Sequence, residues 1–221
     1  MVMSYQVRIK ICGVTRAADA QEAVKLGADA LGLNFYDGSP RRIEAAAVEP
    51  VLRELPPSIE TVGVFVKRPL REVIAVLDSW PRIRTIQWHG EDWPPGEGLS
   101  YRMIPAFAVR DAASLEVVMR HLDACRALER LPAAVLLDGH AAGQYGGTGR
   151  LAPWELIAAF QPGVPVILAG GLTPENVAEA VRVVRPYMVD VASGVESAPG
   201  RKDAEKMRRF IAAAREAAAK L

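Results

Sequence analysis

Two short stretches near the C-terminal end decide the fold of this chain: VILAGGL at residues 166–172 and MVDVASGVE at residues 188–196. Each is an apolar run of strand type that stops abruptly in glycine and small residues, with a helical pattern beyond. Glycine lets backbone N–H groups approach a ligand closely, and N–H groups at a helix start carry partial positive charge, which suits a phosphate. Either stretch alone is consistent with an ordinary strand-to-loop glycine. As a pair at the end of a β/α series they favour a phosphate site, which (β/α)₈ barrels often build from the loops after their last two strands.

The length and composition are those of one globular domain. The chain has 221 residues, of which 50% are hydrophobic and 24% charged, and a single (β/α)₈ barrel typically has ~250 residues. The net charge of +1 gives no indication of a nucleic acid or of an anionic membrane surface as partner. No apolar run approaches the ~20 residues that a membrane span needs, and residues 1–8 lack a hydrophobic signal core. We therefore expect a cytoplasmic protein.

The cysteines and histidines do not suggest a disulfide framework or a metal site. Cys12 and Cys125 are the two cysteines, and the three histidines are His89, His121 and His140. None of them forms a CxxC or HExxH motif, so a dedicated zinc site has little support. Cys125 lies in the middle of a predicted outer helix and is expected to be structural.

Apolar β-branched runs alternate with helix-period segments along the entire chain. Thr15 and Thr173 are plausible helix N-caps, and Pro174 fits a first helical position. The predicted strands are 7–11, 30–35, 61–66, 84–88, 102–107, 133–138, 165–169 and 187–191. The predicted helices are 16–26, 44–55, 70–79, 112–129, 153–160, 175–184 and 203–219.

This alternation predicts an α/β fold, a single (β/α)₈ TIM barrel over residues 1–221, with an open doubly wound sheet as the main competitor. One crossover is irregular. Residues 91–100 contain two prolines and two glycines, which leave no room for a proper helix after strand four, so we expect a loop there.

Two candidate catalytic residues directly follow strands. Cys12 ends the first predicted strand and Asp138 ends the sixth. A lone cysteine is usually a small buried hydrophobe, and a lone aspartate after a strand usually belongs to a turn. In a barrel both would face the inferred phosphate site. There a thiol and a carboxyl form a base and acid pair, and we expect the site to lower the pKa of the thiol and to raise that of the carboxyl.

Other polar residues follow the remaining strands. Arg41, in a turn after the second strand, could grip a carboxylate with two hydrogen bonds, or be a solvated loop arginine. Asp190 is the one charge inside its apolar strand, which favours an inward position near the ligand. His89 closes the fourth strand and either lines the pocket or is a partly buried structural histidine. The glycine-rich residues 139–150 are either a lid or a flexible surface loop.

Together these segments resemble the phosphoribosylanthranilate isomerase family, the barrel enzymes of tryptophan biosynthesis. Each matching motif is weak alone, but their order along nearly the whole chain is specific. The matching residues are Lys10 to Gly13 with Thr15 and Arg16; Ser39 to Arg41; Gly63 to Val66; Gln87 with His89 and Gly90; Leu137 and Asp138; Gly146 to Gly149; Ala169 to Leu172; and Asp190 with Ser193 to Glu196.

The resemblance implies an Amadori rearrangement of N-(5-phosphoribosyl)anthranilate to 1-(o-carboxyphenylamino)-1-deoxyribulose 5-phosphate, without metal or redox cofactor. It implies Cys12 as general base and Asp138 as general acid. Arg41 would lie near the anthranilate carboxylate and Asp190 near the anthranilate nitrogen, with His89 as a further substrate-binding residue. The residues matching the phosphate site are Gly170, Gly171, Ser193 and Gly194. The expected partner is a small phosphorylated substrate, and the chain is expected to be a monomer or a homodimer.

Two departures and three competing hypotheses accompany this resemblance. Trp88 stands where the family usually has leucine, and Ala192 where it often has serine.

A sugar-phosphate isomerase with two aspartates would need an acid at Cys12. An indole-glycerol-phosphate synthase would need a lysine and glutamates at strand ends, of which only Lys67 is present. A non-catalytic phosphate-binding protein on the same fold is the third alternative, although it would usually have lost Cys12 or Asp138.

Overall fold

A closed barrel of parallel strands forms the centre of the molecule in the computed structural model, which describes residues 5–90, 101–139 and 154–221. The barrel order follows the chain order, and β1 pairs with β8 to close the sheet. Closure confirms the predicted barrel and excludes the open doubly wound sheet. The barrel strands are β1 (Arg8–Cys12), β2 (Ala30–Asn34), β3 (Glu60–Val66), β4 (Thr85–His89), β5 (Arg102–Ala108), β6 (Val135–Asp138), β7 (Val166–Ala169) and β8 (Met188–Val191).

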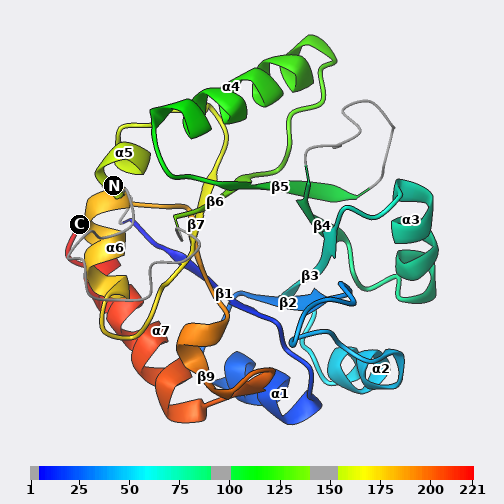
Figure 1. Cartoon of the computed structure of the whole chain (residues 1–221). Coiled ribbons are helices and arrows are strands. Elements are labelled where there is room, and N and C mark those ends of the chain that lie inside the picture. Colours follow the sequence, from blue (N-terminus) through cyan, green and yellow to red (C-terminus); the bar gives the residue numbers. More distant parts are fainter. Residues whose placement is uncertain (1–4, 91–100, 140–153) are drawn as a thin grey trace.

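Helices surround the barrel as an outer layer (Figure 1). They are α1 (Ala17–Lys25), α2 (Ala45–Arg53), α3 (Leu70–Ser79), α4 (Ala112–Ala127), α5 (Trp154–Ala158), α6 (Val177–Val184) and α7 (Ala204–Ala218). Within the described residues no helix separates β4 from β5, although the predicted loop 91–100 itself lies outside them. The glycine-rich residues 140–150 also lie outside the described part of the chain. None of the described helices has the length and apolar character needed to cross a membrane.

The buried apolar side chains form two separate cores. Side chains that point outward pack under the helices in one large buried cluster, as expected for parallel strands covered on their outer face. Side chains that point inward form a smaller cluster, whose members are Ala30, Ile104, Ala134, Leu136, Ile167, Ala169 and Met188. The interior is therefore packed with apolar residues on the side of β5 to β8. Polar residues of β1, β4 and β8 occupy other interior positions, among them Lys10, Gln87 and Asp190.

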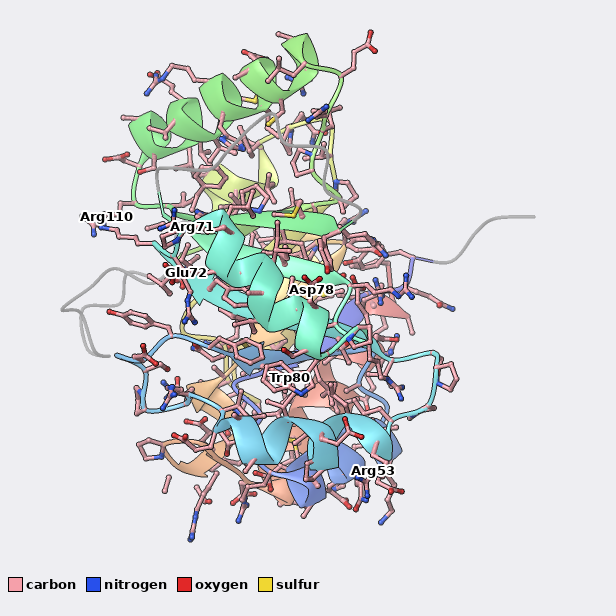
Figure 2. All side chains as sticks on the ribbon, turned by 90° about the vertical axis from the view of Figure 1, so that its right-hand side faces the viewer. Arg53, Arg71, Glu72, Asp78, Trp80 and Arg110 are labelled. Carbon is pink, nitrogen blue, oxygen red and sulfur yellow. The ribbon has the colours of Figure 1, made fainter. Side chains whose placement is uncertain are left out.

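Stacked aromatic rings hold α3 against the barrel. Phe65 of β3 stacks on Phe35 with 5.1 Å between ring centroids, and Phe35 stacks in turn on Trp80 at 5.7 Å. Gly63 leaves the space for the Phe65 ring, because a Cβ there would lie 2.8 Å from Phe65 Cε2. Figure 2 faces α3, where Trp80 follows the end of the helix and the charged side chain of Arg71 is exposed.

The predicted helix caps are wrong. Arg16, not Thr15, is the N-cap of α1, and the Thr15 hydroxyl instead donates to Gly200 O at 2.7 Å. The predicted cap at Thr173 and first helical position at Pro174 precede the start of α6, whose N-cap is Asn176. A turn over these residues leads into the helix, and Asn176 Oδ1 accepts from Thr173 N at 2.8 Å.

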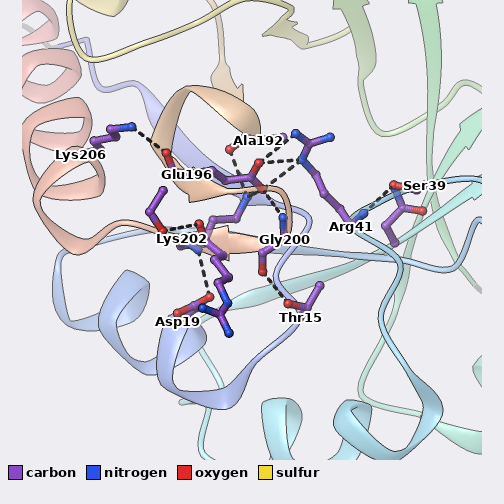
Figure 3. Close-up of polar contacts among 12 residues, drawn as sticks. Thr15, Asp19, Ser39, Arg41, Ala192, Glu196, Gly200, Lys202 and Lys206 are labelled. Atoms are coloured by element: carbon purple, nitrogen blue, oxygen red, sulfur yellow. Dashed lines mark hydrogen bonds and ion pairs between the residues drawn. The ribbon is translucent and has the colours of Figure 1, made fainter.

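A small hairpin follows β8 that the sequence pattern does not predict. The chain passes through the short 3₁₀ helix η1 (Ser193–Val195) into β9 (Glu196–Ala198), which pairs antiparallel with β10 (Arg201–Lys202). The strands are too short to give a periodic signal, and the hairpin lies beside the connections that follow β1 and β2 (Figure 3).

Candidate active site

The predicted site residues gather at one rim of the barrel, because parallel strands all end on the same side. Each lies at or just beyond the C-terminal end of its strand: Cys12 ends β1, Arg41 follows β2, His89 ends β4, Asp138 ends β6, Gly170 and Gly171 follow β7, Asp190 lies in β8, and Ser193 and Gly194 follow β8. This is the face on which barrel enzymes carry their active sites.

A buried ion pair joins the first and last strands below this rim. Lys10 Nζ donates to Asp190 Oδ1 at 2.7 Å, and the two residues are paired in the register of β1 and β8. The Lys10 side chain is completely buried and that of Asp190 is 9% exposed. Burial by itself lowers the pKa of Lys10, but Asp190 and Cys12 outweigh it, so the pKa is raised and the ammonium stays charged.

The Cys12 thiol lies next to this ammonium group. A Cβ at Gly32 of the neighbouring strand would be 2.8 Å from Cys12 Sγ and 3.1 Å from Lys10 Nζ, so both atoms use the space that this glycine leaves. Burial raises the pKa of the Cys12 thiol, and the positive charges of Lys10 and Lys202 oppose the shift only in part. The expectation that the site lowers the pKa of this thiol is therefore wrong, because desolvation is the larger effect.

Asp138 lies across the barrel opening from Cys12. It is the last residue of β6, a strand separated from β1 by β7 and β8 in the barrel order. The two residues thus belong to strands that are not neighbours, and a ligand at the rim can contact both. No three His, Cys, Asp or Glu side chains within the described segments are grouped so that they could hold a metal ion.

Arg41 is held by a buried glutamate. Its Nε lies 3.0 and 3.1 Å from the two carboxylate oxygens of Glu196, and its Nη2 lies 2.8 Å from Oε2. Its aliphatic part covers Gly13, where a Cβ would lie 2.8 Å from Arg41 Cδ. The arginine is thus neither a solvated loop residue nor free to swing, and it is placed directly beside the end of β1.

The two glycine-rich loops after β7 and β8 touch each other. A Cβ on Gly194 would lie 1.9 Å from Leu172 O, so only glycine fits where η1 meets the loop after β7. Gly170 and Gly171 have φ angles of +92° and +65°, a region that favours glycine. Asn176 Nδ2 donates to Gly171 O at 2.9 Å and fixes this loop. Both loops are therefore rigidly placed next to each other at the rim.

His89 is a partly buried neutral histidine. Its Nε2 lies 2.8 Å from Gln87 Nε2, an arrangement in which the amide donates to an unprotonated ring nitrogen. The pKa of His89 is lowered to about 4, chiefly by burial and also by the Lys10 charge, while Asp190 acts in the opposite direction. His89 therefore shares the electrostatic environment of the ion pair.

Three site residues are missing from the sequence-based prediction of roles: Lys10, Glu196 and Lys202. Lys10 could have been found, because it alternates with the apolar residues Ile9 and Ile11 and lies two residues before Cys12, on the same strand face. Glu196 and Lys202 give no such signal. They belong to the unpredicted hairpin, and Glu196 contacts an arginine 155 residues away in the sequence.

The closed barrel and its charged, cysteine-containing rim define the class of protein, a (β/α)₈-barrel enzyme. The model of the N-(5'-phosphoribosyl)anthranilate (PRA) isomerase family matches residues 9–213. The N-(5'-phosphoribosyl)anthranilate isomerase of Geobacter sulfurreducens is 47% identical over 208 residues, which are 93% of this chain and 97% of the relative.

Solved structures show the same likeness. The phosphoribosyl anthranilate isomerase of Thermotoga maritima superimposes with a TM-score of 0.82 at 35% identity, covering 96% of this chain and 100% of the other. A structure of the isomerase in complex with reduced 1-(o-carboxyphenylamino)-1-deoxyribulose 5-phosphate gives 0.79 at 33% identity with the same coverage. This chain belongs to the N-(5'-phosphoribosyl)anthranilate isomerase family, and the family and enzyme class predicted from its residues are confirmed.

The fit of Gly194 against Leu172 O generates a first prediction. In Gly194→Ala the new methyl group must displace the loop after β8, because the facing atom is backbone and cannot give way. We expect the competitive inhibition constant of inorganic phosphate to rise at least about tenfold in this variant, because the displaced loop no longer presents its N–H groups to the anion. Ser197→Ala on the exposed hairpin is the control and should match the unmodified chain. Equal inhibition constants in Gly194→Ala would mean that the phosphate binds elsewhere.

The lowered pKa of His89 makes a second prediction about pH. Between about pH 6.5 and pH 4 the unfolded chain protonates this histidine and the native chain does not, so the free energy of unfolding falls as the pH falls through this window. The effect approaches about 3 kcal/mol below pH 4. The proton NMR signal of the His89 ring should titrate near pH 4 in the folded protein. A midpoint near 6.5 would show that the ring is solvated.

Proposed function

We propose that this chain converts N-(5'-phosphoribosyl)anthranilate to 1-(o-carboxyphenylamino)-1-deoxyribulose 5-phosphate in tryptophan biosynthesis, with Cys12 as base and Asp138 as acid. The observation that carries the proposal is the placement of these two side chains at the ends of β1 and β6 on one rim, next to two contacting glycine loops. The family membership supplies the reaction, an Amadori rearrangement.

The first step opens the ribose ring. Asp138 donates a proton to the furanose ring oxygen, while the lone pair of the aniline nitrogen forms a double bond to C1′ and breaks the bond between C1′ and that oxygen. The product is an open-chain iminium ion, and the aspartate is left as a carboxylate. The substrate's own nitrogen supplies the electrons, so this scheme calls for no redox or metal cofactor.

The second step removes the proton at C2′. The Cys12 thiolate takes it, the electron pair of the C–H bond forms a C1′–C2′ double bond, and the iminium nitrogen regains its lone pair. The resulting enolamine tautomerises to the ketone by losing the proton of the C2′ hydroxyl and gaining one at C1′. Proton exchange with solvent then restores the thiolate and the protonated carboxyl group.

The charges around Cys12 support its role as base. The buried thiol has two cationic neighbours, Lys10 and Lys202, that stabilise the thiolate once it forms. Asp190 neutralises one of these cations and lies where the nitrogen of the bound substrate is expected. His89, uncharged, would line the same pocket without adding a further positive charge.

The remaining substrate contacts follow from the same rim. Gly170, Gly171, Ser193 and Gly194 would hold the phosphate through backbone N–H groups, and Arg41 would bind the anthranilate carboxylate. We further propose that residues 1–221 are a single catalytic domain acting in the cytoplasm as a monomer or homodimer, without nucleic acid or membrane partners.

A direct assay tests the proposed reaction. Freshly prepared phosphoribosylanthranilate is fluorescent, and the protein should accelerate loss of this fluorescence. Rescue of a tryptophan-requiring strain that lacks this step would give the same answer in the cell. Fluorescence loss at the spontaneous rate, with the fold confirmed by circular dichroism, would leave a non-catalytic phosphate-binding protein as the better description.

Removal of either catalytic group should abolish most of the activity. We expect Cys12→Ala and Asp138→Ala each to lower kcat by ~10²–10⁴-fold, the usual contribution of a positioned base or acid. The double variant should be far less than multiplicatively worse, because both groups serve one proton relay. Cys125→Ala, at the other buried cysteine, is the matched control and should retain full activity. Normal turnover in Cys12→Ala would leave the mechanism without its base.

The raised pKa of Cys12 sets the pH dependence of the reaction. Only the thiolate can act as base, and its fraction grows about tenfold per pH unit below the pKa of the thiol. Asp138 must at the same time be protonated to act as acid, so the pH dependence of the base is isolated in Asp138→Asn, where we expect the residual kcat/KM to rise through neutral pH without levelling off. A profile of Asp138→Asn that is already flat at pH 7 would show that the bound substrate or the site lowers this pKa instead.

A further inference from the structure

The hairpin after β8 places one buried carboxylate between two cations. The Glu196 side chain is 5% exposed and contacts Arg41 on one side and Lys202 Nζ, at 2.9 Å from Oε1, on the other. Lys202 is completely buried and also donates to Ala192 O at 3.1 Å. A buried carboxylate is costly unless it is paired, and here both oxygens are satisfied (Figure 3).

The position of Glu196 does not depend on Arg41. Lys206 Nζ donates to the Glu196 carbonyl at 2.7 Å, and the hairpin is anchored to α1 by Lys202 N, which donates to Asp19 Oδ2 at 3.1 Å. Thr15 holds the hairpin turn through Gly200 O. The carboxylate is thus part of a rigid frame, and it is the arginine, 24% exposed, that extends from this frame toward the rim.

Glu196 occupies only one edge of the guanidinium group. It accepts from Nε and Nη2, and no described residue accepts a hydrogen bond from Nη1 of Arg41. A planar guanidinium has a second edge, formed by Nη1 and Nη2, that can bind a further carboxylate with two parallel hydrogen bonds. The contact with Glu196 fixes the plane of the group and so fixes the direction in which this second edge points.

The charges of the cluster match one bound anion. Arg41 and Lys202 carry two positive charges and Glu196 one negative charge, so the three side chains together hold an excess of one positive charge. One substrate carboxylate on the second edge of Arg41 would neutralise the cluster. Without Glu196 the site would hold a buried lysine with no carboxylate partner and an arginine with no fixed orientation.

We propose that Glu196 is a positioning residue that aims Arg41 at the ortho-carboxylate of the substrate and so sets the preference for anthranilate over an uncarboxylated aniline. This rests on the proposed function, because it assumes the anthranilate ring beside Arg41. The opposite hypothesis is that Glu196 only occupies the arginine until substrate displaces it. The two hypotheses predict opposite effects of Glu196 on substrate affinity, since a competing carboxylate weakens binding and a positioning one strengthens it.

Two reduced product analogues separate these hypotheses. One is reduced 1-(o-carboxyphenylamino)-1-deoxyribulose 5-phosphate, and the other lacks only the carboxylate. In Glu196→Gln the dissociation constant of the carboxylated analogue should rise about 10- to 100-fold, as expected for charge-assisted hydrogen bonds, whereas that of the uncarboxylated analogue should stay within about twofold. KM should rise in parallel while kcat stays within about threefold.

Tighter binding of the carboxylated analogue in Glu196→Gln would overturn the proposal in favour of simple competition, and equal weakening of both analogues would show a merely structural role. Glu196→Asp keeps the buried charge but withdraws it from Arg41. It should therefore also lower the ratio of the affinity for the carboxylated analogue to that for the uncarboxylated one. An unchanged ratio would refute the proposal even if the glutamine variant does not fold. In an Arg41→Met background the Glu196→Gln change should have no further effect on the ratio.

Controls keep this test separate from that of the proposed function. Glu179→Gln changes an exposed glutamate that is paired with Arg182 on α6, and it should leave both affinities unchanged. If the unmodified chain binds neither analogue, the proposed function fails. If it binds both equally, the function stands and the role of Arg41 and Glu196 falls.

Discussion

The buried contact between Lys10 and Asp190 links the closure of the barrel to the chemistry of its active site. It joins β1 to β8, and so it lies at the seam where the barrel closes. Either charge alone in this position would be strongly destabilising, because removal of one member of a buried pair typically costs about 3–5 kcal/mol. The pair can form only if the first and last strands meet in the observed register. The register that closes the barrel is therefore also the register that places this ion pair in the active site.

The same pair sets the chemical environment of the reaction. Desolvation raises the pKa of the Cys12 thiol, and the ammonium of Lys10 stays charged next to it because Asp190 is there. A thiolate that forms under these conditions is poorly solvated, which makes it a stronger base, and it lies beside a cation that stabilises its charge. The cluster of Arg41, Glu196 and Lys202 also pairs a buried carboxylate with a buried lysine, and it adds an arginine as a second cationic partner of that carboxylate.

The strands and several site residues could be predicted from local sequence patterns, whereas contacts between distant segments could not. The strands were predictable because parallel strands covered by helices are continuous apolar runs, and Asp190 was predictable because a charge inside such a run must face something polar. Thr15 failed as a helix cap because its hydroxyl bonds to a hairpin near the other end of the chain. Glu196 was not predictable as a partner of Arg41, since nothing local in either segment specifies a contact between residues so distant in sequence. The predicted direction of the pKa shift of Cys12 was wrong, because the shift depends on how deeply the closed barrel buries the thiol.

The fate of the hydrogen at C2′ reveals whether the rearrangement proceeds by proton abstraction from that carbon. Substrate deuterated at this carbon would be converted by the unmodified protein in ordinary water, with the rate and the fate of the label recorded by NMR. If a thiolate removes this hydrogen as a proton, conversion of the deuterated substrate is slower in a single turnover and deuterium appears in the solvent. Conversion at an unchanged rate with all of the deuterium retained in the product would contradict the account.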